Sequence, residues 1–391
     1  MDPEYIGQRV RHWRLKRGVS QRTLAELAGF TQGYISQIEA GTVSVDKRST
    51  QASIAQALQV SVADLTGQPY DPRTIEHSAA TAAIPRLRAA LLSLSLDAQA
   101  ESVAPVGGLQ LRVNEAQAMH NACRYDQLVP VLPELLLDLY AHRASADAGA
   151  MLVWITYATT FAAKYLGYDD LAILAAQQCR ASAGELGDDA WRAVAEFALL
   201  HTLPHEASAL TSQRVIAVIE HFEPASADRR VRQVYGMLHL TAAMRAAVAG
   251  QSTEAIAHLG VAEGAAASMG ESNFSQLWFG PTNAAIWRLG IYAELREGTR
   301  VRDEGRIDVT NLRSYNRQAT YYADLARCIG QVRGREEHAL SLLLRAEAIA
   351  PQRVRLSPAV RETVGAMMRR ARTSAGGAEL RKLAARLGTL D

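Results

Sequence analysis

Basic side chains are concentrated near the two ends of this 391-residue chain. Residues 5–50 hold eight arginines and lysines against three acidic residues, and residues 353–386 hold nine against two. The formal charge of the whole chain is only +2, so the excess is local. Clustered guanidinium and ammonium groups can neutralise the phosphates of nucleic acids, although such a cluster can equally be a solvated face. The two segments are therefore candidates for nucleic-acid contact.

Residue patterns typical of an enzyme active site are not found. The sequence has no phosphate-binding glycine loop, no dinucleotide fingerprint and no nucleophile elbow. His201 and His205 are four residues apart, but Pro204 argues against a shared helical metal site, and we interpret them as loop histidines. The acidic pairs 169–170 and 188–189 fall at predicted helix starts, where negative charge stabilises the helix dipole. We expect no catalysis, no metal and no cofactor.

The cysteines and the apolar runs limit the compartment. Cys123, Cys179 and Cys328 are too few and too widely spaced for a disulfide framework or a zinc knuckle, and they lie in apolar helical contexts typical of small core residues. The longest apolar runs, such as residues 135–137, are far too short to span a membrane. The basic start of the chain lacks the apolar core of a signal peptide. We expect a cytoplasmic protein with no membrane contact.

Residues 4–67 predict five short helices, and all of the elements that follow are predicted to be helical as well. Ser20 and Thr31 are suitable N-caps for the second and third helices, and glycines at 18, 29 and 41 can end the first three. Two short helices joined by residues 29–31 have the geometry of a helix-turn-helix, in which the second helix enters the major groove of DNA.

Four segments of this region resemble the Xre/Cro-type DNA-binding domain. They are residues 14–21 (RLKRGVSQ), 24–29 (LAELAG), 35–41 (ISQIEAG) and 57–62 (ALQVSV). The resemblance covers nearly all of residues 4–67. It implies a lambda-repressor-like fold of five helices that binds a double-stranded DNA operator.

The resemblance also implies roles for individual residues. Gln21 would donate a hydrogen bond to a phosphate, and Gln32 and Gln37 would read base edges, where an amide can pair bidentately with adenine. Gln37 could instead be a solvated amide, and Tyr34 could pack on the helix surface instead of touching DNA. The remaining DNA-contacting positions would be Arg22, Gly33, Tyr34, Ser36, Lys47 and Arg48. Arg14 and Glu39 occupy positions that form a buried salt bridge in this family.

Two departures from the family pattern bear on DNA binding. Gly33 stands where relatives often have a longer side chain that reads bases. The segment 41–46 is nearly uncharged, whereas relatives often carry basic residues there. Fewer phosphate contacts imply a shallower salt dependence and reliance on a dimer for affinity.

Prolines and glycines suggest the domain boundaries. Residues 68–73 contain two prolines, and we place the end of the DNA-binding domain at residue 68. A linker over 69–108 contains one helix, predicted at about 84–94, and a break at 103–108. Residues 109–391 show many helical patterns and no convincing strand pattern. The expected fold class is therefore all-α.

The large helical region is repetitive. Gly167, Gly250 and Gly334 are each followed five residues later by an alanine, and each glycine lies between two predicted helices. A weaker copy without the glycine starts at Arg124. The starts differ by 43, 83 and 84 residues, which are one, two and two units of about 42. Helix pairs at this period indicate an α-solenoid of tetratricopeptide type, and an irregular helical bundle is the alternative.

Residues 278–295 contain polar and aromatic side chains at helical spacing. Asn283, Trp287 and Glu294 share one side of the predicted helix, where an amide could hold a peptide backbone and the neighbouring Arg288 a carboxylate. Trp278, Asn283, Trp287 and Arg288 are therefore candidate ligand-binding residues. Alternatively, the tryptophans belong to the core and Asn283 caps the helix.

These features together predict a bacterial transcription regulator. The architecture resembles the peptide-sensing Rap/Rgg/PlcR-type regulators, which implies a solenoid that dimerises and senses a peptide or another small signalling molecule, as in quorum sensing. A homodimer is expected because one such domain reads few bases. The alternative is a solenoid that serves as a docking scaffold for a partner protein.

Overall fold

The computed structural model describes residues 5–70, 75–98, 105–203, 208–297, 300, 307–330, 334–371 and 377–389. Within these residues the fold is all-α, with α1 to α20 and short 3-10 turns and no strand. No helix in this part of the chain is long and apolar enough to cross a membrane. The expected fold class is confirmed.

Five helices form the N-terminal domain, as predicted. They are α1 (Ile6–Lys16), α2 (Gln21–Ala28), α3 (Gln32–Glu39), α4 (Arg48–Leu58) and α5 (Val62–Thr66). The hydroxyls of Ser20 and Thr31 accept hydrogen bonds from the backbone N–H groups of Thr23 and Tyr34, at 3.0 and 3.2 Å, and so cap α2 and α3. The turn between them passes through Gly29 at φ 74°. Leu24, Ile35 and Ile54 are fully buried among the helices.

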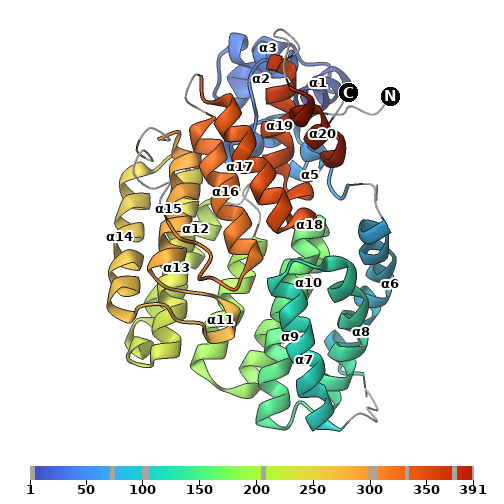
Figure 1. Ribbon diagram of the computed structural model, residues 1–391, viewed down its shortest axis with the longest axis vertical. Helices are drawn as coiled ribbons and strands as arrows, with labels where there is room; N and C mark the ends of the chain where they lie inside the picture. Colours follow the sequence, from blue (N-terminus) through green and yellow to red (C-terminus); the bar gives the residue numbers. More distant parts are fainter. Residues whose placement is uncertain are drawn as a thin grey trace.

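The remaining helices form the solenoid. Their bounds are α6 (Ile75–Ser95), α7 (Val106–Asn121), α8 (Tyr125–Ala141), α9 (Ala146–Leu166), α10 (Asp169–Leu186), α11 (Asp189–Thr202), α12 (Ser208–Phe222), α13 (Arg229–Val248), α14 (Ser252–Met269), α15 (Pro281–Leu295), α16 (Tyr315–Ile329), α17 (Glu336–Ile349), α18 (Pro351–Arg355), α19 (Pro358–Ala371) and α20 (Ala378–Leu387). Figure 1 shows the N-terminal domain at one end of this assembly, beside α19 and α20.

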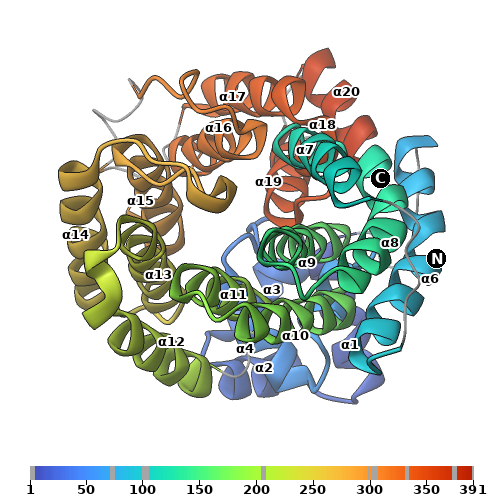
Figure 2. The ribbon, with the colours of Figure 1, turned by 90° about the horizontal axis from the view of Figure 1, so that it is seen from below.

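The solenoid curves into a ring of two layers. Seen along the ring axis, α9, α11, α13, α15 and α16 face the centre, whereas α8, α10, α12, α14 and α17 lie outside (Figure 2). The two ends of the ring meet where α18 contacts the start of α8, since Gln352 donates to Asp126 at 2.6 Å. The helices of the N-terminal domain lie across the far end of the ring (Figure 2).

The three glycines of the predicted repeat lie in turns between consecutive helices of the solenoid. Gly167, Gly250 and Gly334 have φ angles of 85°, 77° and 79° and join the helix pairs α9–α10, α13–α14 and α16–α17. A left-handed φ of this kind favours glycine. The alanines five residues later, Ala172, Ala255 and Ala339, are buried where paired helices cross.

The weak fourth copy is shifted by one residue from the predicted start. Cys123, at φ 56°, occupies the left-handed position between α7 and α8, and Arg124 follows in the conformation that Tyr168 and Gln251 adopt after their glycines. The repeat therefore begins at Cys123 and not at Arg124. The sequence match to the other three copies was weak because a cysteine, and not a glycine, adopts the left-handed conformation in this turn.

Three local predictions need correction. The helix predicted at 84–94 is longer, because α6 starts at Ile75 and accommodates Pro85. The predicted break at 103–108 ends earlier than expected, because α7 begins at Val106 with two glycines in its first turn, whereas residues 103 and 104 lie outside the described residues. His201 belongs to the last turn of α11 instead of a loop, whereas Pro204 and His205 lie outside the described residues.

Candidate functional site

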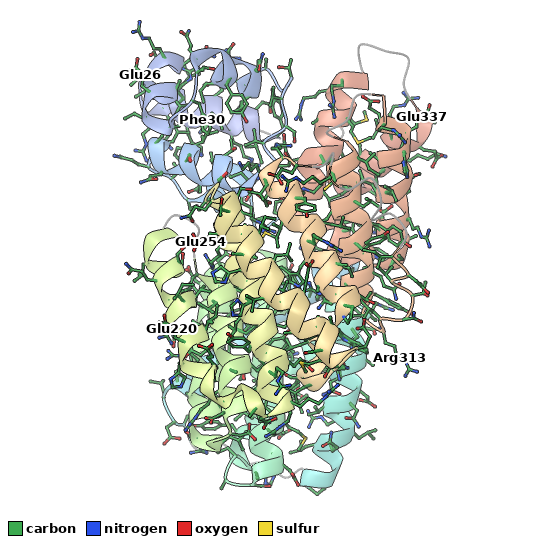
Figure 3. All side chains as sticks on the ribbon, turned by 90° about the vertical axis from the view of Figure 1, so that its left-hand side faces the viewer. Glu26, Phe30, Glu220, Glu254, Arg313 and Glu337 are labelled. Atoms are coloured by element: carbon green, nitrogen blue, oxygen red, sulfur yellow. The ribbon has the colours of Figure 1, made fainter. Side chains whose placement is uncertain are left out.

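The outer face of α3 carries most of the side chains expected to read DNA. Gln32, Gly33, Ser36 and Gln37 are exposed, while Ile35 and Ile38 point into the domain core. Because both glutamine side chains are exposed, their amides are accessible to base edges in a major groove. Figure 3 shows Glu26 of α2 and Phe30 of the turn at the end of the molecule remote from Glu220 and Arg313.

Tyr34 lies at the border between this exposed surface and the domain core. Its ring packs against Phe30 with centroids 5.2 Å apart, and the side chain is half-buried. It also borders a groove between the N-terminal domain and the C-terminal helices, opposite Arg370 of α19. The packing alternative for Tyr34 therefore describes its position in this structure better than a base contact does.

A buried ion pair holds α3 against α1. The Arg14 Nε and the Glu39 carboxylate are 2.6 Å apart, and a second hydrogen bond of 2.9 Å makes the pair bidentate. The Gln21 amide donates to the same carboxylate at 2.9 Å. Gln21 thus links α2 to α3 in this arrangement, and Arg22, exposed beside it, pairs with Glu26 one turn along.

The nearly uncharged loop between α3 and α4 is docked on the solenoid. The Gly41 carbonyl accepts a hydrogen bond from Arg369 at 2.6 Å, and the Val45 N–H donates to Glu362 at 3.1 Å. A side chain at position 41 would collide with Arg369, since an added Cβ would lie 2.4 Å from its Cδ. The absence of a side chain at Gly41 and the backbone N–H of Val45 therefore fit the loop to α19.

Asp46 anchors the same loop through a buried network of charges. Its carboxylate lies 2.7 Å from Arg296 and 3.4 Å from Arg327 of α16. Arg327 also contacts Glu294 of α15 at 3.1 Å and Asp324 at 3.1 Å. Burial alone raises the pKa of Asp46, but the guanidinium groups of Arg327 and Arg296 outweigh burial and lower it below its usual value. Asp46 is therefore a charged partner of the solenoid.

The start of α4 faces the solenoid and not the exposed surface. The Arg48 N–H donates to Glu294 at 3.1 Å, and its guanidinium lies 3.9 Å from the same carboxylate. Lys47, the residue before the helix, is half-buried. Glu294 therefore holds the backbone N–H of Arg48, while the guanidinium is 43% exposed, and the contact of Arg48 with the DNA backbone implied by the resemblance stays a prediction.

A cavity of about 320 Å³ lies inside the ring. Its wall is built from α9, α11, α13, α15, α16 and α18 and, at one end, from α4 and α5 of the N-terminal domain. This domain contributes six residues to the wall: Asp46, Arg48, Gln51, Val62, Thr66 and Gln68. Because both domains line one cavity, an occupant would touch both.

Of the four ligand-binding residues proposed from the sequence, only Trp287 lines this cavity. Asn283 is fully buried and donates to the Leu277 carbonyl at 3.2 Å. Arg288 pairs with Glu263 of α14 at 3.4 Å, and the Trp278 indole donates to Asn121 of α7 at 3.1 Å. The structure places these three residues outside this cavity, because only the middle of α15 (Ile286, Trp287 and Gly290) borders it.

No pattern in the sequence grouped the other charged and aromatic residues of the cavity. Three of them lie on α9, and four come singly from α11, α13, α16 and α18: Phe161, Lys164, Tyr165, His201, Arg245, Arg317 and Arg353. No two of the helices involved have a shared motif, and each residue alone reads as an ordinary helical position. Burial and the nearby ammonium group of Lys164 hold the pKa of His201 well below its usual range, so its ring is neutral.

A comparison with protein families concerns the N-terminal domain. Residues 6–66 match the family model of the helix-turn-helix domain. With the geometry of α2 and α3, this match identifies a helix-turn-helix DNA-binding domain. No curated protein matches the chain significantly. A crystal structure of Bacillus thuringiensis PlcR in complex with the peptide PapR7 and DNA is similar at 17% identity and a TM-score of 0.32, over 67% of this chain and 94% of PlcR.

Proposed function

We propose that this chain is a transcription regulator of the Xre type that reads an operator through α3 and binds an effector inside the solenoid. The observation that carries the proposal is the shared cavity wall, since Arg48 and Gln51 of the DNA-binding domain and Trp287 of the solenoid line the same space. The protein would bind and release operator DNA and effector in the cytoplasm and would catalyse no reaction.

The effector acts through its different affinity for two arrangements of the domains. A molecule in the cavity contacts α4 and α5 only while the DNA-binding domain is docked, so it binds the docked arrangement more tightly. Occupancy then shifts the population toward that arrangement, by at most the difference between the two binding free energies. This shift toward the docked arrangement also changes the position of α3 relative to the α3 of a second subunit.

A homodimer supplies the rest of the affinity. One recognition helix exposes few base-reading side chains here, namely Gln32, Ser36 and Gln37. Two domains on half-sites about one helical turn apart would combine their contacts and their specificity. The operator is therefore expected to be an inverted repeat.

The test is selection of genomic fragments by the full-length protein, followed by mobility-shift titration of the best fragment. An inverted repeat bound with strong preference over scrambled DNA supports the proposal. Equal affinity for scrambled DNA contradicts sequence-specific regulation. Native mass spectrometry of the same preparation reports whether the species is a dimer and whether it retains a small molecule.

A further inference from the structure

The cavity contains more positive than negative charge. Lys164, Arg245, Arg317 and Arg353 all line it, and within the described part of the chain no carboxylate forms an ion pair with any of them. Two of the three acidic residues in the wall, Asp46 and Asp324, are already paired with Arg327. The third, Asp169, lies at the exposed start of α10. The cations in the wall thus exceed the carboxylates available to balance them.

Two of these cations cap the C-terminal end of a helix. Lys164 donates to the His201 carbonyl, and Arg245 donates to the carbonyls of Leu200 and Leu203, so both neutralise the C-terminal end of α11. Capping a helix end is a sufficient reason for cations at these two positions. It does not account for the two arginines on the opposite wall.

Arg317 and Arg353 are held by aromatic rings instead of carboxylates. The Arg317 guanidinium lies 5.5 Å from the centre of the Trp287 ring, and that of Arg353 lies 4.2 Å from the Tyr165 ring. Arg353 also donates to the Asn316 side chain at 3.1 Å. Stacking on a ring fixes a guanidinium plane and leaves N–H groups along its edges for a planar or tetrahedral acid group.

Burial makes this excess charge costly. It lowers the pKa of Lys164 to about 7, with the charges of Arg48 and Arg245 acting in the same direction. Burial also lowers the pKa of Arg245 to about 10, with Arg48 contributing. An anion placed among these groups would replace lost hydration with direct charge-assisted contacts. The cavity is therefore built to gain more from an anionic occupant than from a neutral one.

Apolar side chains also line the cavity, beside uncharged polar groups such as Gln51, Thr241 and Thr320. The apolar part consists mainly of Phe161, Leu200, Met244, Ile286 and the ring of Trp287. A volume of about 320 Å³ lies near the lower end of the range for small-molecule sites, roughly 300–1,000 Å³. Such a space suits a compact molecule with an apolar or aromatic body better than an extended peptide.

We propose that the occupant of the cavity is a small organic anion, whose carboxylate or phosphate group is held by Arg317 and Arg353 and whose apolar body lies against Phe161, Met244 and Trp287. This assignment rests on the proposed function, for which it names the chemical class of the effector. Helix α16 connects the cavity to the DNA-binding domain, because Arg317 lines the cavity and Arg327, farther along the helix, binds Asp46 of that domain.

The test uses two fluorescent probes of nearly the same shape on the full-length protein. One is the anion 8-anilinonaphthalene-1-sulfonate, and the other is the neutral N-phenyl-1-naphthylamine. The anion is expected to bind at one saturable site about tenfold or more tightly than the neutral probe. Equal affinities for the two probes would overturn the proposal without any variant.

Variants then locate the site. Arg317→Gln and Arg353→Gln should each weaken anion binding about tenfold, whereas Arg192→Gln, at an exposed ion pair near the start of α11, should leave it unchanged. Unchanged affinity in both cavity variants would also overturn the proposal. Displacement of the probe by hexanoate or by hexyl phosphate, with hexanol as the neutral reference, distinguishes a carboxylate from a phosphate effector.

Operator binding is measured on the same preparations. If the anion fails to bind while the selected DNA fragment is bound specifically, the ligand class is wrong and the DNA-binding function stands. If the anion binds and no DNA fragment is preferred, the proposed regulatory function fails and the anion site remains.

Discussion

The carboxylate of Asp46 lies 3.4 Å from the Nε of Arg327, although the two residues are separated by 281 positions in the sequence. Both side chains are almost completely buried, at 6% and 4% exposure. The pair joins the loop after the recognition helix to the inner layer of the solenoid. The orientation of the DNA-binding domain therefore depends on a contact that α16 controls.

Removing the charge of Asp46 should release this loop. In Asp46→Asn, Arg296 and Arg327 lose an anionic partner, and breaking a buried pair typically costs about 3–5 kcal/mol. Hydrogen exchange at the amides of Val45 and Arg48, which donate to Glu362 and Glu294, should become about a hundredfold faster or more. Glu26→Gln, at an exposed carboxylate of the same domain, is the matched control. Unaltered protection of both amides in Asp46→Asn would refute this role for the pair.

Base reading should depend on the exposed amides of α3. Gln32→Ala and Gln37→Ala are each expected to reduce affinity for the selected operator about tenfold, because a bidentate amide contact contributes about 1–3 kcal/mol of discrimination. Non-specific binding and thermal stability should not change, since both side chains are exposed. Gln56→Ala, at an exposed position of α4, serves as the control in a mobility-shift titration. Full sequence preference in both variants would show that α3 does not read the bases.

The integrity of the N-terminal domain should depend on the pair between α1 and α3. Arg14→Ala leaves the buried Glu39 carboxylate without its bidentate partner, and we expect a loss of about 3–5 kcal/mol in the free energy of opening. Arg22→Ala removes an ion pair whose side chains are 79% and 64% exposed, and it should cost less than about 0.5 kcal/mol. Hydrogen exchange of the α1 and α3 amides measures both. Similar effects of the two variants would contradict the importance of burial.

Anion binding in the cavity should weaken with rising pH. Burial, reinforced by Arg48 and Arg245 and opposed by Asp169, places the pKa of Lys164 at about 7, so the ammonium group loses its charge as the pH rises through neutrality. Arg353 of α18 also faces this group, and His201 on α11 is already neutral. We expect the affinity for 8-anilinonaphthalene-1-sulfonate to fall severalfold between about pH 6 and 8.5.

Lys164→Met should abolish most of that dependence, and Lys382→Met, at an exposed lysine of α20, should preserve it. The lowered pKa of Lys164 also affects the free energy of unfolding, which changes with pH in the opposite direction to anion affinity. Between pH values of about 7 and 10.5 the unfolded chain holds a proton that the folded protein has released, so the contribution of Lys164 makes stability rise with pH. A pH profile identical in wild type and Lys164→Met would exclude Lys164 as the titrating group.

The sequence alone determined the features that depend on residues close together in the chain. The caps at Ser20 and Thr31, the turn at Gly29 and the glycine–alanine repeat could all be predicted, because capping and tight turns involve residues only a few positions apart. The exposed amides of α3 could be located for the same reason. The unusual lack of charge in residues 41–46 was visible as well, although its cause was not.

The tertiary structure decided which side chains meet inside the ring. Asn283 and Trp287 share a helix face, yet only Trp287 reaches the cavity, because the curvature of the solenoid sets where each inner helix meets its neighbours. Arg317 and Arg353 come together with Trp287 and Tyr165 through the packing of several helices. Asp46 and Arg327 meet because the ring has an end that the DNA-binding domain covers. Such contacts have no sequence period, since they depend on the cumulative geometry of many helix pairs.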